Sequence, residues 1–312
     1  KQLNELLQEM AKVIIGREKE LKLILTALLT EGHVLLEDLP GTGKTTMVKA
    51  FSKGLDCLFS RIQCTPDLLP SDILGSSIFN PKTSEFYFKK GPVFTNVLLV
   101  DEINRTLPRT QSSLLECMEE RQVSIEGKTY DLSSPFIVLA TQNPIEMEGT
   151  FSLPEAQLDR FLMKLKLGYP SEQEEEQMLE QVGDEIPYDD IISKFNPKEV
   201  QEMQKQCRDI HVHASILKYI TALANATRNH SSVSIGVSPR ASKALYKTVK
   251  AWALLNGRSY VIPDDVKDMV KPVWNHRIIL KAEAHMNNIQ PEDILDEIMR
   301  KVDIVAEKVV RL

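Results

Sequence analysis

A glycine-rich segment between an apolar run and a helical pattern constrains the fold of this 312-residue chain more than any other feature. The apolar run His33–Glu37 leads into Asp38-Leu-Pro-Gly-Thr-Gly-Lys-Thr45, and a helical pattern follows over Lys44–Gly54. In such a strand–loop–helix unit, backbone N–H groups of the loop and of the helix N-terminus surround an anion. We therefore predict that the loop holds nucleotide phosphates, with Lys44 at the β- and γ-phosphates and the Thr45 hydroxyl on Mg²⁺.

The first position of this loop departs from the usual pattern, because Asp38 stands where the pattern has glycine. Aspartate tolerates unusual backbone angles better than most residues, so the turn can still form. Its carboxylate would repel a triphosphate, and we expect it to point away. A strand–turn–helix without any ligand is the plainer interpretation, which the glycines and the lysine argue against. The predicted phosphate contacts are Pro40, Gly41, Thr42, Gly43, Lys44, Thr45 and Thr46.

An apolar run that ends in two acidic residues supplies the second part of the predicted site. Val97–Val100 is followed directly by Asp101 and Glu102. A carboxylate at the end of a strand can hold Mg²⁺ directly or through water, so we predict that Asp101 is a metal ligand. We predict that Glu102 polarises the attacking water. The two acids could instead belong to a solvated loop, but their place after a phosphate loop favours the functional interpretation.

Short apolar runs alternate with helical patterns through the first half of the chain. These runs are His33–Glu37, Leu58–Gln63, Val97–Asp101, Phe136–Thr141 and Phe161–Leu167. Three of them are nearly continuous in apolar residues, which is typical of strands buried on both faces of a parallel sheet. The alternation predicts a wound α/β core with about five parallel strands over residues 1–168.

The pattern changes after Tyr169-Pro170, and the second half reads as helical. Ser171–Glu174 has the spacing of a capping box and opens an acidic helix. A proline at the first turn opens several further predicted helices. They begin at Asn196-Pro197, Ser238-Pro239, Pro263 and Pro291. We therefore predict an all-helical domain over residues 169–312.

Two segments of the first half read as hairpins inserted into the core, near residues 76–93 and 121–133. The first, Ser76–Val93, carries the aromatic residues Phe86, Tyr87 and Phe88 followed by two lysines. This aromatic trio could grip another molecule. Equally, Phe86 and Phe88 could anchor the hairpin on its own domain with Tyr87 facing outward, and the sequence leaves both interpretations open.

Composition and charge narrow the class of protein. Apolar residues make up 42% and charged residues 26% of the chain, which is ordinary for a globular protein. The formal net charge of −6 and the lack of a basic run argue against a nucleic-acid motor. The four scattered cysteines fit a reducing compartment. No apolar run reaches the ~18 residues of a membrane span, so we expect a cytoplasmic protein.

Several further stretches resemble the AAA+ ATPases and, within them, the MoxR group. They are Arg61–Asp72, Asp101–Arg105, Gln111–Val123, Ala140–Pro144 and Leu153–Phe161. Together they cover roughly residues 12–168, whereas the second half is matched mainly by Ser238-Pro-Arg240. The resemblance implies an AAA+ phosphate-loop core followed by a helical lid domain, with ATP and Mg²⁺ as cofactors and ATP hydrolysis as the activity. The hairpin placement matches the clade that includes magnesium chelatase and the replicative helicases.

The resemblance also implies roles for individual residues. Asn143 resembles the first sensor, which orients the attacking water. Arg160 resembles the arginine finger, which reaches the nucleotide of a neighbouring subunit, and a planar cation suits charge spread over phosphate oxygens. Arg240 resembles the second sensor, which closes the lid on the γ-phosphate. The segment Ile14-Ile15-Gly16 resembles the one that packs on adenine, where glycine allows close approach.

Each of these roles has a plainer alternative. Asn143 could be a turn residue before a proline, and Arg160 could pair with Asp159 or Glu155. Arg240 could form a surface salt bridge. Residues 14–16 could be a simple helix junction.

The leading functional hypothesis is a ring-forming ATPase that remodels or activates partner proteins or metalloenzyme complexes, as a chaperone does. The resemblance implies a homo-oligomer, a hexameric ring, and partners that carry a von Willebrand factor type A domain. The motor subunit of a magnesium chelatase, a nucleic-acid motor and a monomeric nucleotide switch are the alternatives. The acidic composition counts against the nucleic-acid motor, and a finger that acts between subunits counts against the monomer.

Overall fold

A five-stranded parallel sheet forms the centre of the computed structural model, which describes residues 2–11, 13–37, 43–143, 149–180, 191–193 and 195–304. The strand order is β2-β5-β8-β1-β9, and every pairing in the sheet is parallel. The strands are β1 (Val34–Glu37), β2 (Phe59–Gln63), β5 (Val97–Asp101), β8 (Ile137–Gln142) and β9 (Met163–Lys166). The predicted α/β core is confirmed, and the predicted strand bounds agree to within one or two residues.

Helices of the first half cover the sheet, and the helix predicted over Lys44–Gly54 has those bounds. The helix after the glycine-rich segment starts at Lys44, immediately after Gly43, whose φ of 78° is a conformation that glycine adopts without a steric penalty. The helices are α1 (Gln2–Ala11), α2 (Glu18–Leu29), α3 (Lys44–Gly54), α4 (Pro70–Leu74), α5 (Pro108–Glu120), α6 (Glu155–Leu158) and α7 (Glu172–Glu180), with the 3₁₀ turn η1 (Ile103–Arg105).

Among its described residues, the second half is helical apart from one short sheet. Its helices are α8 (Pro197–Asp209), α9 (Ala214–Arg228), α10 (Pro239–Leu255), α11 (Pro263–Trp274), α12 (Ala282–Met286) and α13 (Pro291–Lys301), with the 3₁₀ turn η3 (Asn275–Arg277). The exception is a small antiparallel pair, β10 (Val233–Ile235) with β11 (Ile279–Leu280). The prediction of an all-helical region was therefore wrong in this detail, because strands this short carry no readable alternation.

The predicted helix caps are confirmed. Asn196 accepts hydrogen bonds from the backbone of Lys198 at 3.0 Å and Glu199 at 3.2 Å at the start of α8. At the start of α7, the Glu174 carboxylate accepts from the Ser171 N–H at 2.7 Å, which forms half of the predicted capping box. Each cap satisfies backbone groups that the first turn of a helix leaves unpaired.

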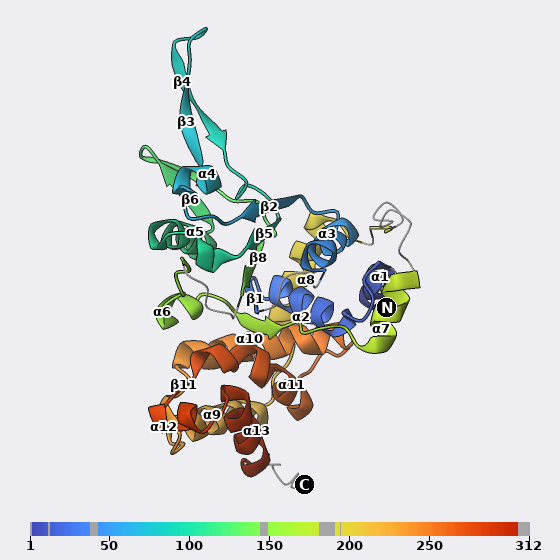
Figure 1. Ribbon diagram of the computed structural model, residues 1–312. Coiled ribbons are helices and arrows are strands. Elements are labelled where there is room, and N and C mark those ends of the chain that lie inside the picture. The colour runs from blue at the N-terminus through green and yellow to red at the C-terminus, as the bar shows by residue number, and fades with distance from the viewer. Residues whose placement is uncertain are drawn as a thin grey trace.

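Both predicted hairpins are present. The first consists of β3 (Gly75–Asn80) and β4 (Glu85–Lys90), and the second of β6 (Gln122–Ile125) and β7 (Lys128–Asp131). Figure 1 shows the β3–β4 hairpin extending from one end of the molecule, opposite the end where α9, α11 and α13 gather.

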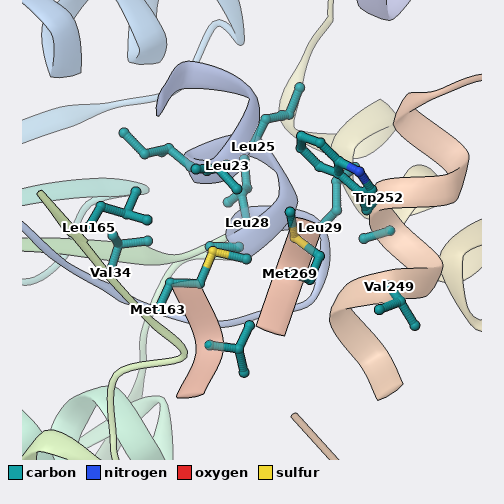
Figure 2. Packing of buried hydrophobic residues seen from close by; sticks show 14 of the residues in the cluster. Leu23, Leu25, Leu28, Leu29, Val34, Met163, Leu165, Val249, Trp252 and Met269 are labelled. Atoms are coloured by element: carbon teal, nitrogen blue, oxygen red, sulfur yellow. The ribbon is translucent and has the colours of Figure 1, made fainter. Parts of the chain in front are cut away.

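The two halves of the chain share an apolar core through α2. Figure 2 shows Leu23, Leu25, Leu28 and Leu29 of α2 lying between the sheet residues Val34, Met163 and Leu165 and the lid residues Val249, Trp252 and Met269. Burial of a side chain of this size contributes about 1.5–3 kcal/mol to stability. Since the core is continuous across residue 168, the division into domains 1–168 and 169–312 stays a prediction. None of the helices in the described ranges has the length and apolar character that a membrane crossing requires.

Candidate functional site

The carboxyl edge of the sheet gathers most of the predicted nucleotide-binding residues. Because β1, β5 and β8 are parallel neighbours through β8, their carboxyl ends meet at one edge. Helix α3 begins just beyond β1, Asp101 and Glu102 end or follow β5, and Asn143 follows β8. The topology therefore brings Lys44, Thr45, Asp101, Glu102 and Asn143 to the same edge, as the motifs require.

The described part of the phosphate loop begins at Gly43. Pro40, Gly41 and Thr42 lie outside the described residues, as does Asp38. Lys44, Thr45 and Thr46 are half-buried in the first turn of α3. A Cβ added at Gly43 would meet nothing within 4 Å, so this position requires glycine for its backbone angle rather than for space.

The two acids at the end of β5 accept hydrogen bonds from side chains of the neighbouring strand β2 and of the turn η1. Asp101 is buried, and its Oδ2 accepts a hydrogen bond from Arg61 Nε at 2.6 Å. Glu102 has a φ of 56°, an uncommon backbone conformation that recurs at functional sites. Its Oε2 accepts from Arg105 Nη1 at 3.0 Å and from Gln63 Nε2 at 3.3 Å. In this arrangement both carboxylates are engaged by protein donors.

The oxygen donors at this edge fit Mg²⁺. Among the described residues, Asp101 Oδ1 accepts one long hydrogen bond of 3.4 Å, from the Thr141 hydroxyl, which leaves lone pairs for a hard cation. The Thr45 hydroxyl lies in the first turn of α3 at the same edge. Among the described residues, no group of three His, Cys, Asp or Glu side chains could form a metal cage. Such a donor set suits Mg²⁺ held by one carboxylate and a hydroxyl while its other ligands are water and phosphate.

Two buried oxygens near the predicted water site have no hydrogen-bond partner among the described residues. They are Asn104 Oδ1 and Gln142 Oε1. Gln142 ends β8 directly before Asn143, and Asn104 Nδ2 donates to the Asn143 backbone oxygen at 3.4 Å. Buried polar atoms normally have partners, so these two acceptors are available to a group that binds at this edge.

The predicted adenine segment lies in the turn between α1 and α2. Ile14 is buried and Ile15 half-buried, and Gly16 has a φ of 72°. The space beside Gly16 is taken by Glu174 of α7, whose Cδ would stand 2.2 Å from an added Cβ. The close approach at Gly16 is therefore to the chain itself, and the contact of this segment with adenine stays a prediction.

The two predicted catalytic arginines lie at the opposite, amino edge of the sheet. Helix α5 begins near the carboxyl edge and ends near the amino edge. Near its end, the Met118 backbone oxygen accepts a hydrogen bond of 3.0 Å from the ring of His33, which directly precedes β1. Arg160 Nε lies 3.4 Å from Glu119 Oε2 of the same helix end, and Arg240 Nη2 lies 3.1 Å from Glu119 Oε1. A strand rises about 3.3 Å per residue, so a five-residue strand separates the two edges by roughly 15 Å.

These arginines belong to a chain of ion pairs, which we call the arginine cluster: Glu119, Asp159, Arg160, Arg240 and Arg277. Asp159 Oδ2 lies 3.6 Å from Arg240 Nε, and Asp159 Oδ1 lies 2.7 Å from Arg277 Nε. The plainer alternative for Arg240, a salt bridge, is thus present, whereas Arg160 pairs with Glu119 rather than with Asp159 or Glu155. Three cations and two anions give the cluster a net charge of +1 (3 − 2), so it suits an anion.

Comparison with known proteins decides the family. Residues 33–163 match the ATPase family associated with various cellular activities (AAA), and residues 225–298 match the AAA lid domain. The chaperone MoxR1 of Mycobacterium tuberculosis is 41% identical over 94% of this chain and 80% of its own length. Protein MoxR of Paracoccus denitrificans is 32% identical, covering 86% of each chain. The chain belongs to the MoxR family of AAA ATPases.

Other relatives of this MoxR-family ATPase extend over nearly its whole length. The Bacillus subtilis protein YeaC is 47% identical over 98% of this chain and 96% of its own. A solved structure from Cytophaga hutchinsonii superposes with a TM-score of 0.92 at 41% identity, covering 98% of this chain and 95% of the other. The predicted family, the ATPase activity and the α/β fold with a helical lid are confirmed, and membership of the family implies that the nucleotide is ATP.

Sequence reasoning about this MoxR-family ATPase missed three polar side chains around the predicted catalytic groups. Arg61 and Gln63 were noted only as letters of the family pattern, and Arg277 was not noted at all. Alternation along β2 could have found the first two, since both are exposed polar positions in a strand and lie two residues apart. Nothing in the sequence around Arg277 indicated its part in the arginine cluster.

Proposed function

We propose that this ATPase assembles into a homo-oligomeric ring, with the six subunits that the family resemblance implies. In this proposal, ATP hydrolysis at the subunit interfaces drives the remodelling or activation of partner proteins. The observation that carries the proposal is the separation of the two half-sites. Phosphate-binding and acidic residues lie at the carboxyl edge of the sheet, whereas Arg160 and Arg240 lie together at the amino edge.

A chain with complementary half-sites on opposite edges binds its own copies head to tail. Such a contact is heterologous, and it closes into a ring when the rotation between subunits permits. We infer that Arg160 and Arg240 both reach the nucleotide of the neighbouring subunit. This assignment differs from a lid that closes on the γ-phosphate of its own chain, because Arg240 pairs with Glu119 at the amino edge.

The residues at the carboxyl edge divide the chemistry among themselves. Lys44 binds the β- and γ-phosphates, and Glu102 accepts a proton from the attacking water, which Asn143 orients. Mg²⁺, held by Thr45 and Asp101 when bound, neutralises charge on the phosphates. The neighbour's arginines stabilise the charge that develops on the transferred group. Glu102 must first exchange its hydrogen bonds with Arg105 and Gln63 for one with water, so the described arrangement corresponds to a resting site.

The β3–β4 hairpin is the surface that we propose for contact with the partner protein. Phe79 and Phe86 are cross-strand neighbours with ring centroids 5.2 Å apart, and they are 49% and 69% exposed. Tyr87 on the other face is 51% exposed. Phe88 instead packs at the base, with its ring centroid 4.4 Å from that of Tyr130 in the second hairpin. Of the two interpretations left open, Phe88 thus follows the anchoring one and Phe86 the exposed one.

The chemistry of the tip fits a protein partner. Exposed aromatic residues supply large contact area at low entropic cost, which is why they are enriched where proteins bind each other. One relative is named a chaperone, which supports a chaperone-like role. A partner with a von Willebrand factor type A domain, as the family resemblance implies, belongs to the proposal.

Mixing of two inactive variants tests the shared site. Arg160→Ala keeps its own carboxyl edge intact, and Glu102→Gln keeps an intact finger. Each variant alone is expected to lose hydrolysis, whereas an equimolar mixture is expected to regain roughly a quarter of the wild-type rate, because random neighbours restore that share of interfaces. A mixture that stays inactive while still forming assemblies would contradict a site shared between subunits.

A further inference from the structure

The turn η3 at the end of α11 joins the lid to the segment that carries Arg160. This segment, Asp159–Lys164, leads from α6 into β9 at the amino edge of the sheet. Residues of η3 contact it from the lid side. The contacts link two parts of the chain that lie more than a hundred residues apart in sequence.

Arg277 makes most of these contacts. Its Nε donates to Asp159 Oδ1 at 2.7 Å, and its Nη2 donates to the backbone oxygens of Asp159 at 3.2 Å and Phe161 at 2.9 Å. Its Nη1 donates to the Leu162 oxygen at 3.3 Å and to the Val273 oxygen of the preceding helix α11 at 2.7 Å. Every nitrogen of the guanidinium therefore has an acceptor, and most of the acceptors belong to the segment around Arg160.

The other two residues of η3 support the same segment. His276 Nε2 lies 3.0 Å from the Phe161 backbone oxygen, and Asn275 Nδ2 donates to the Lys164 oxygen at 3.2 Å. The contacts thus follow the segment from the acid beside Arg160 into the first residues of β9.

Because Arg277 is buried, its hydrogen bonds restrict the conformation of the backbone around Arg160. Its side chain is only 6% exposed, whereas those of Arg160 and Arg240 are 31% and 58% exposed. A buried cation is tolerated only when acceptors satisfy it, so the backbone around Arg160 is held in the one arrangement that satisfies Arg277. Burial lowers the pKa of Arg277 and the charge of Asp159 opposes that shift, but an arginine stays protonated.

We propose that Arg277 is the positioning residue of the arginine finger, fixing the Asp159–Leu162 backbone so that Arg160 and Arg240 meet the neighbour's nucleotide as one unit. This inference rests on the proposed function, in which both arginines act between subunits. Asp159 links Arg240 to Arg277, because its Oδ2 pairs with Arg240 and its Oδ1 with Arg277. A movement of the lid would then move the finger with it.

Arg277→Lys tests the proposal. Lysine keeps the charge but cannot reach acceptors on so many sides, so the segment loosens. Since a misplacement of 1 Å can cost on the order of 10²-fold in rate, kcat is expected to fall at least about tenfold while KM for ATP changes less than about threefold. Hydrogen exchange of the Phe161–Met163 amides is expected to accelerate, which reports the loosening without reference to activity.

Arg258→Lys is the matched control. Arg258 forms a double ion pair with Asp265, with Nη1 2.7 Å and Nη2 2.5 Å from its two carboxylate oxygens. This pair lies at the other end of α11, about 18 Å away along a twelve-residue helix. Its lysine variant is expected to lower the thermal unfolding temperature like Arg277→Lys, but to leave kcat and exchange in Phe161–Met163 at wild-type values. Equal kcat losses in both variants would overturn the proposal.

Mixing separates a failure of this inference from a failure of the proposed function. Arg277→Lys mixed with Glu102→Gln is expected to regain hydrolysis, as is Arg160→Ala mixed with Glu102→Gln. Recovery only with Arg160→Ala would show that the Arg277 defect lies in its own active site and would overturn the inference alone. Recovery with neither would overturn the shared site itself.

A smaller change tests the proposal if the lysine variant does not fold. Asn275→Ala removes the contacts of the Asn275 side chain with the Lys164 oxygen and with the His276 ring, and leaves the ion pairs of Arg277 intact. This variant is expected to lower kcat by about two- to fivefold, with partial recovery of hydrolysis when it is mixed with Glu102→Gln. Wild-type kcat and wild-type exchange in this variant would count against the positioning role of η3.

Discussion

At the scale of single residues, the two acids of the nucleotide site differ in their surroundings. Asp101 is buried and accepts a hydrogen bond from Arg61. Glu102 is half-buried, has a positive φ, and accepts hydrogen bonds from Arg105 and Gln63. A buried paired carboxylate suits a fixed metal ligand, and a carboxylate with exposed, exchangeable partners suits a proton acceptor. These surroundings are compatible with the roles predicted for the two residues, and the roles themselves stay predictions.

Glu102→Gln is expected to lower kcat by roughly 10²–10⁴-fold, the usual contribution of a general base. The amide keeps the size of the side chain and its contacts, so ATP binding is expected to be retained and the ATP-bound assembly to accumulate. Steady-state hydrolysis and size-exclusion chromatography with ATP measure both effects. Glu120→Gln, an exposed acid at the end of α5, is the control. Wild-type turnover in Glu102→Gln would remove Glu102 from the mechanism.

His33 makes the stability of the core depend on pH. Burial, followed by the charge of Arg121, lowers the pKa of His33 from 6.5 to about 3. Its neutral ring accepts from the Val138 N–H at 2.9 Å and donates to the Met118 oxygen at 3.0 Å. The unfolded chain takes up this proton near pH 6.5, so the contribution of His33 to the free energy of unfolding is fully present above pH 6.5 and is lost as the pH falls towards 3.

The expected loss from this residue is about 2 kcal/mol at pH 5. His33→Gln, which cannot titrate, is expected to show a flatter dependence of unfolding free energy on pH between 6.5 and 5. Denaturant unfolding at several pH values measures the difference between variant and wild type. His285→Gln, at an exposed position, is expected to keep the wild-type slope. Parallel slopes for all three proteins would contradict the assignment.

At the scale of elements, the two hairpins support each other at their bases. Phe88 of β4 stacks on Tyr130 of β7 and lies edge-on to Phe94, with centroids 5.6 Å apart. Further out, Phe79 and Phe86 contact each other and solvent. The first hairpin thus combines a structural base with an exposed apolar tip.

Substitutions along β4 separate these two roles. Phe88→Ala is expected to destabilise the protein by about 1–3 kcal/mol through lost aromatic packing. Phe86→Ala, at an exposed site, is expected to change stability by less than about 0.5 kcal/mol, and to weaken binding of the partner protein instead. Denaturant unfolding and partner-stimulated ATP hydrolysis measure the two effects. The proposed contact would fail if Phe86→Ala left stimulation by an identified partner unchanged.

At the scale of the whole molecule, the proposed function would make activity a property of the assembly, because the two half-sites lie at opposite edges of the sheet. A single subunit carries Lys44 and Glu102 at one edge and Arg160 and Arg240 at the other, about a strand length away. In the proposed ring, the amino edge of one copy would meet the nucleotide at the carboxyl edge of its neighbour.

Turnover per subunit is therefore expected to rise with protein concentration until assembly is complete. Hydrolysis rates measured from nanomolar to micromolar concentrations, beside sedimentation velocity under the same conditions, test this dependence. Arg160→Ala is expected to sediment as the wild type does but to show low turnover throughout. Constant turnover in a range where sedimentation reports monomers would support the monomeric switch instead.

Local features of the sequence were sufficient to predict most of the fold. Apolar runs identified the five strands of the sheet, and cap residues such as Asn196 and Ser238 marked the starts of helices. These features are readable because their causes lie within a few residues: burial on both faces, backbone angles and the unpaired groups of a first turn. The β10–β11 pair escaped prediction, because its strands are two and three residues long and pair across distant sequence.

The sequence by itself determined the nucleotide motif, because Lys44 with its neighbours and the pair Asp101 and Glu102 stand in contiguous stretches at strand ends. Only the tertiary structure decided which edge each arginine occupies. Arg240 meets Glu119 across 121 positions, and Arg277 meets Asp159 across 118. Ion pairs over such separations depend on how the lid packs on the sheet, and no local pattern of residues encodes that packing.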